Sequence, residues 1–123
     1  MSEEEVDAVV RTGVRLFNRG RYIDAQMVWE DGWRGGAGDD RPFLEALVQL
    51  AGGLHLRTRR GATRGAQHLL SQALVTLEDY RPAAHGLDVE DLVTEFGTYV
   101  DWMRSVARPH RLTDALRIPR LKV

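Results

Sequence analysis

The sequence of 123 residues contains no cysteine, no long apolar run and no marked excess of charge of either sign. The absence of cysteine excludes disulfide bonds, thiolate catalysis and cysteine-ligated zinc sites. No apolar run approaches the length that spans a bilayer, and the acidic N-terminus is unlike a secretory signal peptide. We therefore expect a cytoplasmic chain without a membrane partner.

Charge is nearly balanced along the chain. The chain contains seventeen Lys and Arg residues and eighteen Asp and Glu residues. This balance argues against general electrostatic binding of nucleic acid. One local basic cluster lies at the end of the predicted third helix and in the next turn, where arginines complement the negative end of the helix dipole. A phosphate contact is the less favoured interpretation of this cluster, which comprises Arg57, Arg59, Arg60 and Arg64.

Helical periodicity and capping signals divide the chain into five segments. Ser2 and Glu5 have the spacing of a capping box, and Gly20 has the position of a helix-ending glycine. Asp40 and Asp88 are expected to cap two of the later helices. The predicted helices span about 2–19, 22–33, 42–58, 63–77 and 89–103, with a glycine-rich loop at 35–39.

The fold class that follows is all-α: a compact single-domain bundle of about five helices, with no strand pattern. The length allows one domain over residues 1–123, of which 107–123 form a C-terminal tail. The helix at 42–58 is apolar on nearly every side, which is typical of the centre of a bundle. Gly52 and Gly53 lie within it and would cost stability unless another backbone crosses close by.

The stretch AQMVWEDGWR, residues 25–34, holds the most distinctive constellation. Trp29 and Trp33 are four residues apart and share a helix face; we expect packing, with a stacking wall for a planar ligand as the alternative. Glu30 and Arg34 have the spacing of a helical ion pair, which is weak if exposed and costly to bury without further partners.

A polar stripe on the third helix could supply those partners. Glu45 and Gln49 lie one turn apart on an otherwise apolar helix, which indicates either a satisfied buried network or the floor of a cleft. His55 lies about 120° around the helix from Gln49 and is more readily interpreted as a hydrogen-bonded core residue than as a ligand.

The runs FNRGRYIDAQMVWEDGWR and RPFLEALVQLAGGLHLRTRRGATRGAQHLLSQALVTL resemble a family of small prokaryotic all-helical proteins, domain of unknown function family 309. The resemblance covers roughly residues 13–80. The Gly-x-Tyr-x-x-Ala step at 20–25 is also similar to a tetratricopeptide hairpin, which favours antiparallel hairpins, although no 34-residue period recurs.

Some members of the family carry the label of predicted metal-dependent hydrolase, so the resemblance implies an enzyme as one alternative. In that alternative Glu30 acts as general base and His55 as acid or metal ligand. The family pattern places a histidine one turn before the glutamate, whereas this chain has Gln26, a much poorer metal ligand. We therefore expect no stoichiometric transition metal and no cofactor.

The leading hypothesis is a helical binding or interaction module with a polar pocket between the second and third helices. A small anionic molecule would be oriented there by Arg34, while Glu30 holds Arg34 or accepts a ligand proton. The sequence leaves enzymatic activity undecided, and a third alternative is a structural homo-oligomer formed through the C-terminal tail. The candidate ligand-binding residues are Gln26, Glu30, Trp33, Arg34, Glu45, Gln49 and His55.

Overall fold

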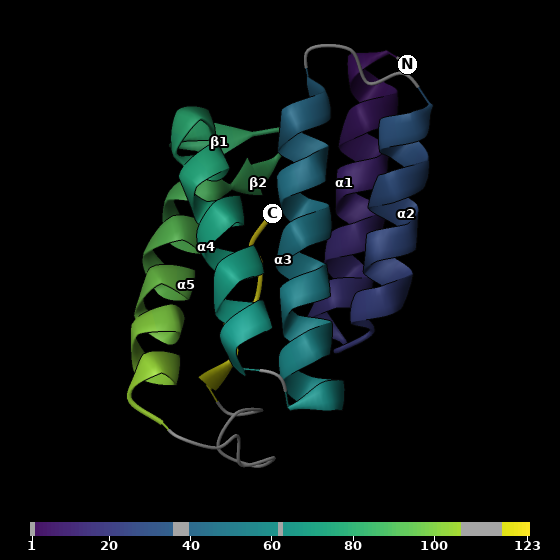
Figure 1. The fold of residues 1–123 in the computed structure, drawn as a ribbon. Helices are drawn as coiled ribbons and strands as arrows, with labels where there is room; N and C mark the ends of the chain where they lie inside the picture. The colour runs from purple at the N-terminus through teal and green to yellow at the C-terminus, as the bar shows by residue number, and fades with distance from the viewer. Residues whose placement is uncertain (1, 36–39, 62, 107–116) are drawn as a thin grey trace.

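The computed structural model of the chain describes residues 2–35, 40–61, 63–106 and 117–123 (Figure 1). These residues form five α-helices: α1 (Glu3–Asn18), α2 (Tyr22–Arg34), α3 (Arg41–Arg60), α4 (Thr63–Leu77) and α5 (Val89–Arg104). A 3-10 turn, η2 (Glu78–Tyr80), follows α4. The predicted all-α bundle is confirmed. Most of the glycine-rich loop, at 36–39, and most of the tail, at 107–116, lie outside the described residues.

The helix boundaries arise from local chemistry that the sequence shows. At α1 the Ser2 hydroxyl accepts a hydrogen bond from the Glu5 amide at 3.2 Å, and the Glu5 carboxylate accepts one from the Ser2 amide at 3.3 Å. Gly20 follows the last turn of α1 with a φ of 77°, a conformation that glycine adopts without strain. At α5 the carboxylate of Asp88 accepts a hydrogen bond from the Asp91 amide at 2.9 Å.

Consecutive helices pack against one another, and α3 lies between α2 and α4 (Figure 1). One continuous apolar core joins them, and the fully buried Trp29 and Phe17 belong to it. The position of α3 explains why it is apolar on so many sides, because only one narrow stripe of it faces solvent. This stripe lies between α2 and α4.

A short hairpin departs from the expectation of no strands. Strands β1 (Ala83–Ala84) and β2 (Leu87–Asp88) pair antiparallel between η2 and α5. Gly86 has a φ of 79° and His85 a φ of 50° in the two-residue turn between them. Two-residue strands are too short for an alternating pattern to be recognised in the sequence.

The C-terminal residues pack against the helices of the same chain. Leu121 is buried, its amide donates to the Asn18 side-chain carbonyl at 2.8 Å, and its carbonyl accepts from the Asn18 amide group at 2.9 Å. The Lys122 carbonyl accepts a hydrogen bond from the Asp88 amide at 2.8 Å. Leu121, one of the apolar residues of this tail, is thus buried within its own chain.

Candidate functional site

Three of the residues predicted to form a polar pocket lie in a row along α2. The Gln26 amide group donates to the Glu30 carboxylate at 3.0 Å, and the Arg34 guanidinium lies 3.8 Å from that carboxylate. Arg34 is 68 % exposed at its side chain and Glu30 27 %. The ion pair is therefore a surface pair, and the inward, desolvated arrangement considered from the sequence is not what the structure contains.

The surface position of this pair sets the expected outcome of a double-mutant cycle. We expect Arg34→Ala to destabilise the chain by less than about 1 kcal/mol, because exposed helical ion pairs contribute little. The coupling between Glu30→Gln and Arg34→Ala in denaturant unfolding should stay below about 0.5 kcal/mol. A coupling of about 3 kcal/mol or more would contradict the exposed geometry.

The two tryptophans have separate roles. Trp29 is fully buried, and its indole nitrogen lies 3.5 Å from the Val10 carbonyl, so packing, the favoured interpretation, holds for it. Trp33 is only partly buried, and the Arg41 guanidinium lies over its ring at 4.6 Å from the centroid. The indole nitrogen of Trp33 is buried without a hydrogen-bond partner among the described residues.

The remaining predicted residues lie on α3 and do not join the row on α2. Glu45 is exposed, while Gln49 and His55 are partly buried. Within the described part of the chain, no hydrogen bond or ion pair connects Glu45 or Gln49 to Glu30 or Arg34. The pocket predicted between the second and third helices is therefore not assembled as one polar cluster.

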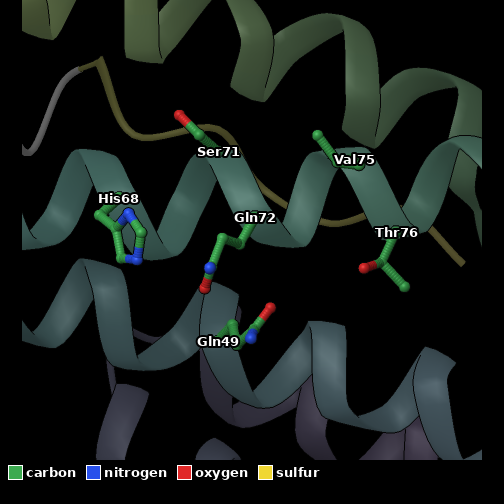
Figure 2. Close-up of a pocket in the computed structure, with 6 residues that line it drawn as sticks. All are labelled: Gln49, His68, Ser71, Gln72, Val75 and Thr76. Atoms are coloured by element: carbon green, nitrogen blue, oxygen red, sulfur yellow. The ribbon is translucent and has the colours of Figure 1, made fainter.

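Instead, Gln49 lines a groove between α3 and α4 of about 420 Å³. Figure 2 shows Gln72 of α4 and Gln49 of α3 pointing toward one another, with His68 one turn away. No lining residue carries a formal charge when His68 is neutral; the other lining residues are Ser71, Val75 and Thr76. The groove can offer hydrogen-bond donors and acceptors to a partner but no cation for an anionic one.

Sequence reasoning did not assign the α4 side of this groove, although a signal was present. Residues 65–77 contain no Asp, Glu, Lys or Arg, in a chain where 28 % of residues are charged. This uncharged run includes partly or fully exposed side chains, and Val75 is 73 % exposed. The combination of an exposed helix face and missing charge is typical of surfaces that contact another molecule.

The polar residues of the groove were also compared with the arrangements that hydrolysis requires. His68 and Ser71 are three residues apart on α4 but point to different sides of the helix (Figure 2). In the described residues no three His, Cys, Asp or Glu side chains are grouped so that they could hold a metal ion. Gln26 donates a hydrogen bond to Glu30 in the place of the family histidine, so the donor set that the family label implies does not fit a metal ion here.

A second polar cluster lies at the opposite end of the molecule from the α3–α4 turn. His85 is 8 % exposed at its side chain; its Nδ1 lies 2.6 Å from the Asp7 carboxylate and its Nε2 2.9 Å from the Asp40 carboxylate. Asp40 was expected to cap α3, but its side chain makes no capping bond and binds the imidazole instead. The pair with an imidazolium carries charge on both partners, whereas the backbone amide of a capping bond is neutral, which accounts for the difference.

His85 thereby joins α1, the hairpin and the start of α3. Burial alone would lower its pKa, but the hydrogen bonds that the Asp40 and Asp7 carboxylates accept from the ring outweigh burial and raise the pKa above its ordinary value of 6.5. The two nitrogens of one imidazole point in opposite directions, so Asp7 and Asp40 cannot share a metal ion with it. His85, Asp7 and Asp40 therefore form a structural cluster, here called the clamp, that links these three elements.

The clamp predicts how stability depends on pH. A folded state that holds the His85 proton more tightly than the unfolded chain is stabilised fully below about pH 6.5, and this contribution is lost as pH rises through the raised folded-state pKa. We expect His85→Asn, which tolerates the left-handed backbone but carries no charge, to cost about 2 kcal/mol at pH 6 and less at pH 9. Equal losses at both pH values, measured by urea unfolding, would show that protonation plays no part.

Two comparisons with known proteins bear on these sites. A search among curated proteins found none that matches the chain. The family model of the domain of unknown function DUF309 matches residues 10–69, which include all of α2 and α3 and the first half of α4. The resemblance covers roughly residues 13–80. The match to the family model begins three residues before that range, at residue 10, and ends within it, at residue 69. The resemblance is therefore confirmed: residues 10–69 of this chain match the family model of DUF309.

Proposed function

We propose that the chain is an interaction module that binds a protein surface through its α3–α4 face, which we define by the groove residues Gln49, His68, Ser71, Gln72, Val75 and Thr76. The observation that carries this proposal is the lack of charge on an exposed helix face. Charged residues are depleted at the centre of protein interfaces, because removing their hydration is costly. Elsewhere on the surface of this chain charge is abundant.

The chemistry of the lining favours a protein partner over the small anionic molecule considered from the sequence. Gln49 and Gln72 each present one amide oxygen and one amide nitrogen, so they can pair with peptide groups or with other amide side chains. No arginine or lysine lines the groove, and Arg34 is already beside Glu30 on α2. An anion would lose its hydration here without gaining a cation.

Site-specific photo-crosslinking tests the proposal. A photoreactive phenylalanine analogue placed at Val75, in cells that naturally produce the chain, should give covalent protein adducts after irradiation. The same analogue at Arg11, which is exposed on α1, is the matched control and should give few adducts. Adduct yields at position 75 that do not exceed those at position 11 would contradict the proposal.

A further inference from the structure

The charges around the α3–α4 face are arranged in two groups. On α3, the helical spacing of 45, 49, 52, 56 and 60 places Glu45 at one end of the solvent-facing stripe and Arg60 at the other. On α4 and the turn after it, the corresponding stripe begins at Arg64, passes through His68 and Gln72 and ends near Asp79. All four charged residues are exposed.

The packing of the helices brings like charges to the same end. A β-carbon built on Gly65, near the start of α4, would lie 3.4 Å from Leu56, near the end of α3. At the other end, Tyr80, just after α4, contacts Phe43 in the first turn of α3, with ring centroids 5.0 Å apart. The two helices therefore run antiparallel. One end of the face is therefore basic, with Arg60 and Arg64, and the other end is acidic.

Other charged groups do not cancel this polarity. Arg41, at the acidic end, lies over the Trp33 ring on the α2 side. Arg81 pairs with the carboxylates of both Glu78 and Glu90, so these three residues together still carry a net negative charge. At the basic end, Arg59 is also exposed and adds to the positive charge.

A face with an uncharged centre and oppositely charged ends is complementary to itself. If a two-fold axis lies in the contact plane and perpendicular to the helices, each basic end meets the acidic end of the other copy. Each α3 then crosses the α3 of its partner antiparallel, and each α4 crosses the other α4. Arg60 would face Glu45 of the second copy, and Arg64 would face its Asp79.

Gly52 supplies an independent observation in favour of this arrangement. It is half-buried, and a β-carbon built on it would meet its nearest neighbour, the Gln26 side-chain oxygen, at 3.4 Å. The fold of one chain therefore has room for a side chain there, although glycine inside a helix costs about 1 kcal/mol relative to alanine. Gly52 lies midway between Glu45 and Arg60, where the two α3 helices would cross and where a missing side chain permits close approach.

We propose that the partner of the α3–α4 face is a second copy of this chain, bound antiparallel about a two-fold axis. This inference rests on the interaction function proposed above and names its partner. Because α4 is a 15-residue helix, about 22 Å long, the covered area lies toward the lower end of stable interfaces. We therefore expect a dissociation constant in the micromolar range.

Charge reversal tests the pairing directly. The first variant, Arg60→Glu with Arg64→Glu, makes both ends acidic, and the second, Glu45→Arg with Asp79→Arg, makes both ends basic. Each variant alone should be monomeric in sedimentation velocity, with a dimer dissociation constant raised by about a hundredfold or more. An equimolar mixture of the two should dimerise again, and more weakly at high salt.

Several outcomes would overturn the inference. A wild-type chain that stays monomeric at millimolar concentration excludes the dimer, and a dimer unaffected by both reversals uses another surface. Because the four substituted residues are exposed, circular dichroism should show that both variants fold. The crosslinking experiment separates this inference from the proposed function: an adduct of twice the chain mass supports both, an adduct with a different protein overturns only the dimer, and no adduct above the control overturns both.

Discussion

Gly13→Ala is expected to destabilise the chain by about 3 kcal/mol or more, the largest effect of any single methyl group added to it. A β-carbon at position 13 would lie 2.1 Å from the indole Nε1 of Trp29 and 2.2 Å from its Cε2. Trp29 has no room to move, because it is fully buried and packs against Phe17 with ring centroids 6.0 Å apart. Helices α1 and α2 would have to separate.

Gly97→Ala is the matched control for this experiment. Gly97 also lies inside a helix, α5, but no atom outside the neighbouring backbone of that helix lies within 4 Å of a β-carbon built on it. Alanine there should be neutral or stabilising by about 0.5–1 kcal/mol, since it restricts the unfolded chain. Similar midpoints of urea unfolding for the two variants would contradict the packing of Trp29 on Gly13.

Gly53→Leu is expected to have the second largest effect, a loss of about 3 kcal/mol or more from overpacking. A β-carbon at this position would approach Leu70 Cγ to 2.9 Å and the Ala66 carbonyl to 3.3 Å. The backbone carbonyl cannot swing away as a side chain could, so α3 and α4 must move apart. The sequence indicated that another backbone crosses close to both glycines of the pair.

The structure has close contacts at Gly53 but room for a side chain at Gly52. Around Gly52 the nearest atoms are 3.4 and 3.7 Å from a built β-carbon, and both belong to side chains, of Gln26 and Leu69. We expect Gly52→Leu to cost about 1 kcal/mol or less in a chain diluted to the monomer. A Gly52 variant that unfolds as easily as the Gly53 variant would show that another element packs on both glycines.

Local signals allowed most of the fold to be predicted from the sequence. The Ser2–Glu5 capping box, Gly20 and the Asp88 cap each act over a few residues, so their chemistry is visible in the linear order. The contact of Gly13 with Trp29 could not be predicted, because it depends on how two helices are placed against each other. The bond from Asp40 to His85 joins residues far apart in the chain and equally lacks a local signal.

The candidate site could be predicted only in part, and for a similar reason. The spacing of Gln26, Glu30 and Arg34 correctly indicated a row on one face of a helix, but not that Arg34 would stay at the surface. Gln49 was recognised as an unusual polar residue on the central helix, yet its neighbours come from α4 rather than α2. Periodicity identifies which residues share a face, whereas the helix that covers the face is set by packing of the whole chain.

The side-chain amide signals of glutamine provide the most direct test of the claim that the α3–α4 face is an interaction surface. Heteronuclear NMR spectra of the ¹⁵N-labelled chain would be compared between a dilute solution and an extract of the cells that produce it. We expect the amide signals of Gln49 and Gln72 to shift or broaden, while that of Asn18, which is bonded to Leu121 away from this face, stays unchanged. Unchanged signals for Gln49 and Gln72, with or without shifts at Gln26, would contradict the assignment of this face.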